Sequence, residues 1–319
     1  MLVLNGHTPR QTVHSVTFAP DGNSLASSSL DGTVRLWDWR AGTNRIVARL
    51  ISGYASRCVA FAPEGRTLAW CDQALSERGY HRWQIILNEL ESEARAVLSM
   101  GGQEYPEDFH FCYSPDGRLL AAAESNVYLW DVVNGVELWS WGNYSVTGSL
   151  AFAPDGQTLA VGRSNRNDRT GRLRHEVVLF HPGTRIIHGV LAAPRRVRNL
   201  TFSPNGRLLA AACENTLTVW ETPLQEGDSG TIRVVPQAIF TCKSGRRHFQ
   251  GLAFTPDGHH LAATHNDKTV RIWDTRSWAE RVAFDWGIGE VVCIAFAPDG
   301  MVAAAGGRSG RIVVWDVDL

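Results

Sequence analysis

Arginine is the residue type whose numbers and spacing could do chemistry in this chain. The segment from Arg163 to Arg174 holds five arginines against one aspartate. Two more basic groups follow it, the first made of Arg195, Arg196 and Arg198 and the second of Lys243, Arg246 and Arg247. A guanidinium is planar and can bind a carboxylate or a phosphate through two hydrogen bonds. The chemistry that these residues suit is therefore recognition of anionic groups.

The sequence contains no local catalytic motif. It has no His-Glu-x-x-His, no Gly-x-Ser-x-Gly, no phosphate-binding loop and no cluster of metal ligands. We therefore predict that the chain is not an enzyme and that it has no catalytic residues, no metal site and no cofactor. A catalytic site assembled from residues far apart in the sequence stays open as an alternative, because such a site leaves no local motif.

Composition limits what the arginines could bind. The formal net charge of −1 gives no general attraction to nucleic acid or to an anionic membrane, so any charge effect must be local. Every cationic residue except Lys243 and Lys268 is an arginine, a bias that a GC-rich genome also explains. Hydrophobic residues make up 44% of the chain, which is typical of a folded globular protein.

The cysteines indicate a reducing compartment. They are widely spaced and stand mostly in apolar runs, at positions 58, 71, 112, 213, 242 and 293. Such residues are predicted to be buried thiols that form no disulfide and bind no metal. No apolar stretch reaches the roughly 18 residues that span a membrane, and the beginning of the sequence lacks a signal pattern. We expect a cytoplasmic protein that does not bind membranes.

One motif recurs seven times along the chain. An apolar run closes in Pro-Asp-Gly or a close variant at residues 16–22, 59–65, 111–117, 150–156, 200–206, 252–258 and 294–300. Proline presets φ at one corner of a tight turn and glycine accepts positive φ at another, so each motif is predicted to join two antiparallel strands. A strand of small residues, a second turn, a strand ending in Trp-Asp and a fourth strand follow. Each repeat is therefore predicted to form a four-stranded sheet.

These repeats resemble the WD-repeat family of β-propellers, and the resemblance covers the whole chain. Five repeats carry a Trp-Asp or Trp-Glu ending, whereas the second and fourth read Leu87-Asn88-Glu89 and Leu179-Phe180-His181 there. The resemblance implies an all-β, seven-bladed propeller of four-stranded antiparallel blades, forming a single domain over residues 1–319.

The two ends of the sequence complement each other. Only three residues follow Trp315-Asp316, too few for the outer strand of the seventh blade, while Leu2-Val3-Leu4 precedes the first complete repeat. We predict that the N-terminal strand completes the seventh blade, which would remove an exposed sheet edge.

The family resemblance implies a structural role for one group that could be mistaken for a hydrolytic site. Propellers of this family bury a hydrogen-bonded set of His, Ser or Thr, Asp and Trp, and the matching residues of the first repeat are His7, Ser27, Asp31 and Trp37. Other repeats depart from this pattern, with Ala210, Ala263 and Ala305 at the serine position. Those blades are expected to depend more on packing.

The same resemblance places the arginines on one face. Turns between the second and third strands share a face, called the top, with the links between blades. Two of these turns are long, at 72–84 and 163–176. The expected basic sector of the top face holds 11 of the 31 cationic residues: Arg163, Arg166, Arg169, Arg172, Arg174, Arg195, Arg196, Arg198, Lys243, Arg246 and Arg247. Solvated loops without a ligand are the alternative explanation.

A second candidate is the mouth of the central channel. The family often binds peptides there through the residue four before each repeat's aromatic, which gives His14, Arg57, Phe109, Gly148, Arg198, Gln250 and Val292 here. Arginine and aromatic residues are enriched at binding hot spots. Trp83, beside the long turn of the second repeat, is expected to be an exposed anchor.

The function that follows is a non-catalytic scaffold that mediates protein–protein interactions through its top face and channel mouth. The expected partner is a protein or peptide, including an acidic or phosphorylated one. Binding of nucleic acid or a phosphorylated ligand by the arginine-rich face is an alternative, as is a propeller enzyme with its site in the channel. We expect the chain to be a monomer.

Overall fold

The computed structural model describes residues 1–50, 57–75, 81–100, 109–142, 146–166, 172–222, 233–234 and 238–318. Within these ranges the secondary structure consists of β-strands and turns. No helix that is long and apolar enough to cross a membrane occurs in the described part of the chain.

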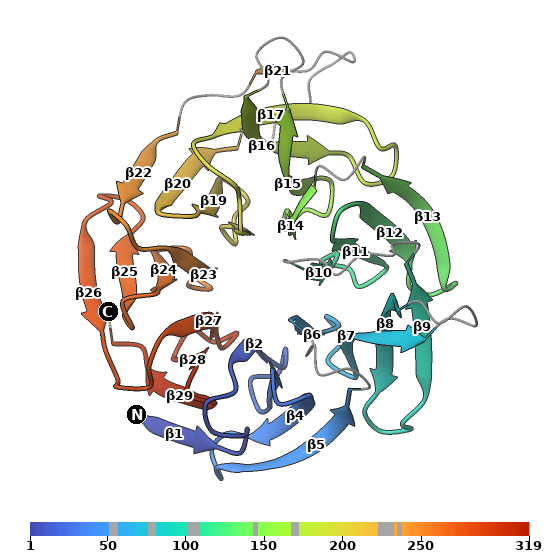
Figure 1. The fold of residues 1–319 in the computed structure, drawn as a ribbon, viewed down its shortest axis with the longest axis vertical. Helices are drawn as coiled ribbons and strands as arrows, with labels where there is room; N and C mark the ends of the chain where they lie inside the picture. The colour runs from blue at the N-terminus through green and yellow to red at the C-terminus, as the bar shows by residue number, and fades with distance from the viewer. Residues whose placement is uncertain are drawn as a thin grey trace. The chain divides into compact units, whose positions relative to one another are not determined.

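The strands form seven sheets in chain order (Figure 1). Sheet 1 contains β2 (Val13–Phe18), β3 (Leu25–Ser29), β4 (Thr33–Asp38) and β5 (Thr43–Arg49). Sheet 2 contains β6 (Val59–Phe61), β7 (Thr67–Leu75), β8 (His81–Glu89) and β9 (Arg95–Ser99). Sheet 3 contains β10 (His110–Tyr113), β11 (Leu119–Ala123), β12 (Val127–Asp131) and β13 (Val136–Trp141).

Sheet 4 has a short fifth strand, because β21 pairs in parallel with its last long strand. It contains β14 (Val146–Phe152), β15 (Leu159–Arg166), β16 (Leu173–Phe180), β17 (Ile187–Ala193) and β21 (Arg233–Val234). Sheet 5 contains β18 (Asn199–Phe202), β19 (Leu208–Cys213), β20 (Thr216–Glu221) and β22 (Phe240–Lys243). Sheet 6 contains β23 (Phe249–Phe254), β24 (His260–His265), β25 (Val270–Asp274) and β26 (Glu280–Phe284).

Sheet 7 contains β27 (Val291–Phe296), β28 (Val302–Gly307), β29 (Arg311–Asp316) and β1 (Leu2–Asn5). The N-terminal β1 lies antiparallel beside β29, with Leu2 opposite Val314 and Asn5 opposite Arg311 (Figure 1). The predicted closure of the seventh sheet by the N-terminus is confirmed. Seven successive antiparallel sheets of this kind define a seven-bladed β-propeller, as the repeats predicted.

The first turn of every sheet has the same geometry. Its glycine has a φ of 70° to 79° in all seven copies, from Gly206 at 70° to Gly65 at 79°, a region that side chains with a Cβ disfavour. The amide of Gly22 donates to the carbonyl of Ala19 at 2.8 Å, and Asp21 accepts from the backbone amide of Asn23 at 2.9 Å. Proline, an acceptor side chain and glycine therefore each have a separate task in this turn.

The chain divides into two compact units, one of Met1–Tyr105 with Thr255–Leu319 and the other of Pro106–Phe254. In the first unit, Leu4 from β1 is buried in one cluster with Val13, Trp37 and Val314. In the second unit, residues of sheets 4 and 5 bury a cluster that includes Trp220. The assignment of residues 1–319 to a single domain stays a prediction.

One turn departs from the residue type that its backbone favours. Lys268 has a φ of 80°, whereas glycines occupy the equivalent turn positions in sheets 1 and 7, with φ values of 75° at Gly32 and 80° at Gly310. Lys268→Gly should relieve left-handed strain of about 1–2 kcal/mol, partly offset by the greater freedom of glycine in the unfolded chain. We expect thermal unfolding to move up by roughly 2 °C. Lys268→Ala is the control that retains the strain, and a lower midpoint for the glycine variant would contradict the interpretation.

Candidate binding surfaces

Arg163 takes part in contacts within the protein, and its ligand-binding role stays a prediction. It lies on β15 opposite Glu176 of β16, and its Nη2 atom is 2.5 Å from Glu176 Oε2. Its guanidinium also lies over the Trp141 ring, 5.6 Å from the centroid. Only 19% of the Arg163 side chain is exposed. The positive charge of Arg163 is therefore largely balanced by Glu176.

The remaining arginines of this segment differ in how far they are described. The Arg166 side chain and the whole of Arg169 lie outside the described residues. Arg172 and Arg174 are exposed at the start of β16. No described carboxylate lies within ion-pair distance of Arg174, so its charge is available to a ligand.

Two of the basic groups meet at the turn between β19 and β20. Glu214 and Asn215 form this two-residue turn. The Nη1 atom of Arg195 is 3.6 Å from Glu214 Oε2, and the Asn215 side-chain amide donates to the carbonyl of Gly245 at 2.5 Å. The next residue, Arg246, is exposed. The segments around Arg195 and Arg246 therefore flank one turn.

The third basic group joins them through the β16–β17 ladder. His175 lies opposite Ala193, which places Arg174 near the start of the link that carries Arg195. We call the exposed cations gathered here the arginine surface: Arg172, Arg174, Arg195, Lys243, Arg246 and Arg247. The sequence grouped these residues through the family resemblance, and the contacts within Pro106–Phe254 bring their segments together. Arg196 and Arg198 lie in the same link but are partly buried.

Two aromatic candidates are not on the surface. The Trp83 side chain is only 6% exposed and Phe109 only 1%. The rings of Phe109 and Phe111 pack edge to face, with centroids 6.2 Å apart. The expectations that Trp83 is an exposed anchor and that Phe109 forms an aromatic rim are wrong, because both rings fill the interior.

The other mouth candidates remain at least partly accessible. Arg57 is exposed, while His14, Arg198 and Gln250 are partly buried. Burial, together with the positive charges of Arg57 and Arg308, lowers the pKa of His14 to about 4. His14 is therefore neutral near pH 7. Arg308 is a neighbour that the mouth positions did not predict.

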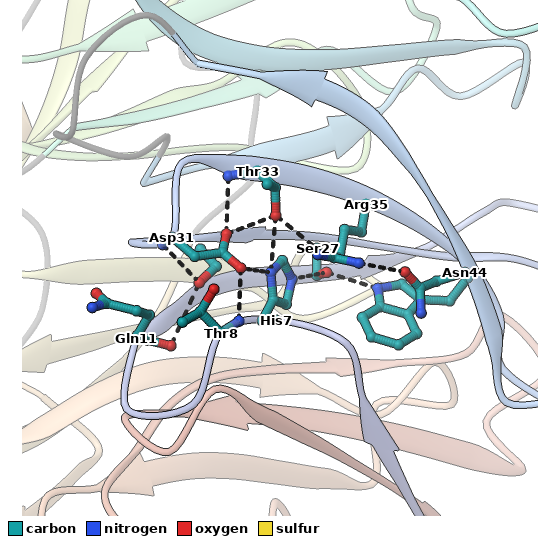
Figure 2. Close-up of polar contacts among 10 residues, drawn as sticks. His7, Thr8, Gln11, Ser27, Asp31, Thr33, Arg35 and Asn44 are labelled. Carbon is teal, nitrogen blue, oxygen red and sulfur yellow. Dashed lines mark hydrogen bonds and ion pairs between the residues drawn. The ribbon is translucent and has the colours of Figure 1, made fainter.

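The family-implied hydrogen-bonded set forms in sheet 1 (Figure 2). The Trp37 Nε1 atom donates to Ser27 Oγ at 2.7 Å, and Ser27 Oγ lies 2.7 Å from His7 Nε2. On the other side of the imidazole, His7 Nδ1 is 3.0 Å from Asp31 Oδ2. The chain of contacts connects the link after β1 to both β3 and β4.

Asp31 is held in its ionised form by this network. Burial raises the pKa of its carboxyl, but hydrogen bonds from His7, Thr33 and the amide of Thr8 outweigh burial and hold the pKa well below its usual range. Ser27 is fully buried, so a substrate cannot reach its hydroxyl. The group is structural, as the resemblance implied, although its composition resembles a hydrolytic triad.

Sheet 6 contains a related network that the sequence reasoning missed. His265 Nδ1 is 2.9 Å from Asp267 Oδ1, and Arg271 Nη2 donates to Asp267 Oδ2 at 2.9 Å. The imidazole comes from the end of β24, where sheet 1 has Ser29. The histidine of this network does not occupy the position that His7 has in the first repeat, so the family pattern did not predict it. The sequence signal for the network was His265, which stands two residues before Asp267.

The described residues contain no group of three or more His, Cys, Asp or Glu side chains that could hold a metal ion. None of the six cysteines, all of which lie within the described ranges, forms a disulfide.

Comparison with known proteins agrees with the repeat geometry. The family model "WD domain, G-beta repeat" matches residues 1–38, 187–221, 237–274 and 287–316. A guanine nucleotide-binding protein subunit beta from Zea mays is 23% identical over 333 residues, which cover 99% of this chain and 70% of the relative. The Nuclear distribution protein PAC1 of Coccidioides posadasii is 25% identical over 342 residues, covering 95% of this chain and 67% of the relative.

The seven sheets, the repeated turn and the buried histidine network define a β-propeller that is built from sequence repeats. The chain resembles WD-repeat proteins, in four segments that match the family model and along most of its length in these relatives. Propellers of this family are typically protein-interaction scaffolds and are generally non-catalytic.

Proposed function

We propose that this chain is a non-catalytic scaffold that holds an acidic or phosphorylated segment of a protein partner on the arginine surface. The observation that carries the proposal is the convergence of three basic segments around the Glu214–Asn215 turn. Glu214 pairs with one of these segments, at 3.6 Å from Arg195. Arg174 and Arg246 are exposed with no described carboxylate within ion-pair distance, which leaves an excess of positive charge.

The backbone beneath these side chains supports a fixed arrangement. The amide of Ser244 donates to the carbonyl of Asn215 at 3.0 Å, and the amide of Phe249 donates to the carbonyl of Glu214 at 2.9 Å. These two bonds position the Arg246 segment before a ligand arrives. The amide of Arg198 donates to the carbonyl of Ala212 at 2.8 Å and positions the Arg195 segment in the same way. Such preorganisation reduces the entropy lost on binding.

The residues predicted for the channel mouth are a second part of the proposal. In the first compact unit His14 and Arg57 keep accessible surface, and in the second unit Arg198 and Gln250 do so. We also propose that the protein is a cytoplasmic monomer. Burial raises the thiol pKa of Cys213 and Cys293 to about 12, so these two thiols should be unreactive near neutral pH.

Substitution of three exposed arginines tests the proposal. The variant Arg174→Gln, Arg195→Gln, Arg246→Gln should bind a partner recovered from the source cell about 1,000-fold more weakly, because each charge-assisted hydrogen bond contributes roughly 1.5 kcal/mol or more. Calorimetry with the recovered partner, and with its acidic or phosphorylated peptides, gives the affinity.

A variant with the same change in net charge is the matched control. Arg45→Gln, Arg49→Gln, Arg276→Gln removes three exposed arginines from other sheets and should bind normally. Equal loss in both triple variants would contradict a local site. A steep linear fall of log affinity with log salt on a DNA or RNA probe, without peptide binding, would instead favour nucleic acid.

A further inference from the structure

His14 occupies an irregular position in its strand. The pairing register between β2 and β3 shifts between Val13 and Ser15, so His14 is the extra residue of a β-bulge. A bulge turns a side chain away from the regular ladder, and bulges are frequent beside binding sites. Within the described part of the chain, the His14 imidazole makes no hydrogen bond. The imidazole of His14 is thus partly buried and has no hydrogen-bond partner among the described residues.

Strands on both sides bring a guanidinium toward this imidazole. On one side Ser15 Oγ donates to the carbonyl of Val59 at 3.5 Å, two residues after Arg57. On the other side Cys293 Sγ contacts the carbonyl of Val13 at 3.5 Å, and a Cβ on Gly306 would be only 2.7 Å from Val13 Cγ1. Arg308 follows two residues after Gly306. The charges of Arg57 and Arg308 both act on His14.

Arg308 is held in place by its surroundings. Its Nε atom is 2.9 Å from Glu290 Oε2, and its amide donates to the carbonyl of Glu290 at 2.9 Å. Even so, 64% of the Arg308 side chain is exposed, so its remaining donors can reach a ligand. Arg57 is also exposed, and no described carboxylate pairs with it. Among the described residues, Arg57 and Arg308 are the charged groups that act on His14, and Glu290 pairs with Arg308.

We propose that His14, Arg57 and Arg308 form an anion site for a phosphoryl group, and that this site takes up a proton when the anion binds. It lies within the first compact unit, on other residues than the arginine surface. It deepens the proposed binding role of His14 and Arg57 at the channel mouth. The three groups come from three separate segments, which suits the three terminal oxygens of a tetrahedral phosphoryl group better than the two coplanar oxygens of a carboxylate.

The direction of the proton linkage follows from the charges. In the free protein the pKa of His14 is about 4, so the imidazole is neutral at pH 7 and adds no charge. A bound dianion favours the imidazolium and raises that pKa. Between about 4 and the raised value, binding takes up a proton, and affinity rises as pH falls. Below about 4 the imidazole is protonated in both states, and the pH dependence ends.

Sulfate is the first probe, because it stays a dianion throughout this range and leaves His14 as the group that titrates. Histidine NMR signals of the full chain, followed from pH 3.5 to 8 in sulfate and in chloride of equal ionic strength, should show the His14 midpoint at least one pH unit higher in sulfate. Inorganic phosphate and a phosphoserine peptide then distinguish a free ion from a modified partner.

Three variants complete the test. His14→Gln should retain sulfate binding near pH 7 but lose the increase in sulfate affinity, of up to tenfold per pH unit, that the wild type shows as pH falls. Arg57→Gln and Arg308→Gln should each weaken sulfate binding about tenfold. Arg276→Gln, an exposed arginine elsewhere, should change nothing. An unmoved His14 midpoint in sulfate, or an unchanged pH dependence in His14→Gln, would overturn the proposal. If the sulfate experiment fails but the Arg174, Arg195 and Arg246 variant loses partner binding as predicted, the site at His14 is wrong and the proposed role of the arginine surface is supported.

Discussion

Ser27→Ala should destabilise the protein by about 3 kcal/mol, as measured by chemical denaturation. The substitution removes the acceptor of the Trp37 indole N–H and the partner of His7 Nε2, which both lie 2.7 Å from the Ser27 hydroxyl. The three side chains are buried, so water cannot replace the lost bonds. Each buried polar group left without a partner costs roughly 1–3 kcal/mol.

The neighbouring serine provides a matched control. Ser28 is also fully buried on β3, but its hydroxyl has no hydrogen-bond partner. Ser28→Ala should therefore be neutral or slightly stabilising, because it removes an unsatisfied hydroxyl. Equal destabilisation by the two substitutions would mean that the network of His7, Ser27, Asp31 and Trp37 does not stabilise the fold.

Removal of residues 1–5 should have a larger effect. It leaves the edge of β29 unpaired along four residue pairs and takes Leu4, which is 1% exposed, out of its core cluster. Truncation of a buried leucine to alanine alone lowers the free energy of unfolding by about 2–5 kcal/mol. We expect the midpoint temperature of thermal unfolding to fall by roughly 10 °C or more, and we expect the protein to aggregate through the uncovered edge of β29.

Two point substitutions separate packing from loss of chain length. Leu4→Ala should account for a large part of the destabilisation, whereas Leu2→Ala, on the same strand but 38% exposed, should cost less than about 1 kcal/mol. A truncated protein with an unchanged midpoint would show that β1 does not complete the seventh sheet in solution.

The fold was predictable because its signals repeat. Proline, aspartate and glycine in one turn have local physical reasons, and seven copies of that turn fix the number of sheets. The complementary chain ends likewise predicted the pairing of Leu2 with Val314. Local geometry of this kind is encoded within a few residues, so it can be deduced from a single sequence.

The site was predictable only in part. The arginine-rich segments were visible, but the sequence could not show that Glu176 neutralises Arg163 or that Glu214 pairs with Arg195, since those acids are 13 and 19 residues away. The burial of Trp83 and Phe109 also depends on which way a side chain faces within its sheet. Arg308 was missed because its proximity to His14 arises from packing between sheets 7 and 1.

Hydrogen exchange of the protein with and without its recovered partner tests the central claim most directly. A protein held on the arginine surface should slow exchange at residues 194–198, 214–215 and 243–248, while the Pro-Asp-Gly turns at 20–22 and 298–300 keep their rates. Protection confined to those turns, with the arginine segments unchanged, would contradict the account.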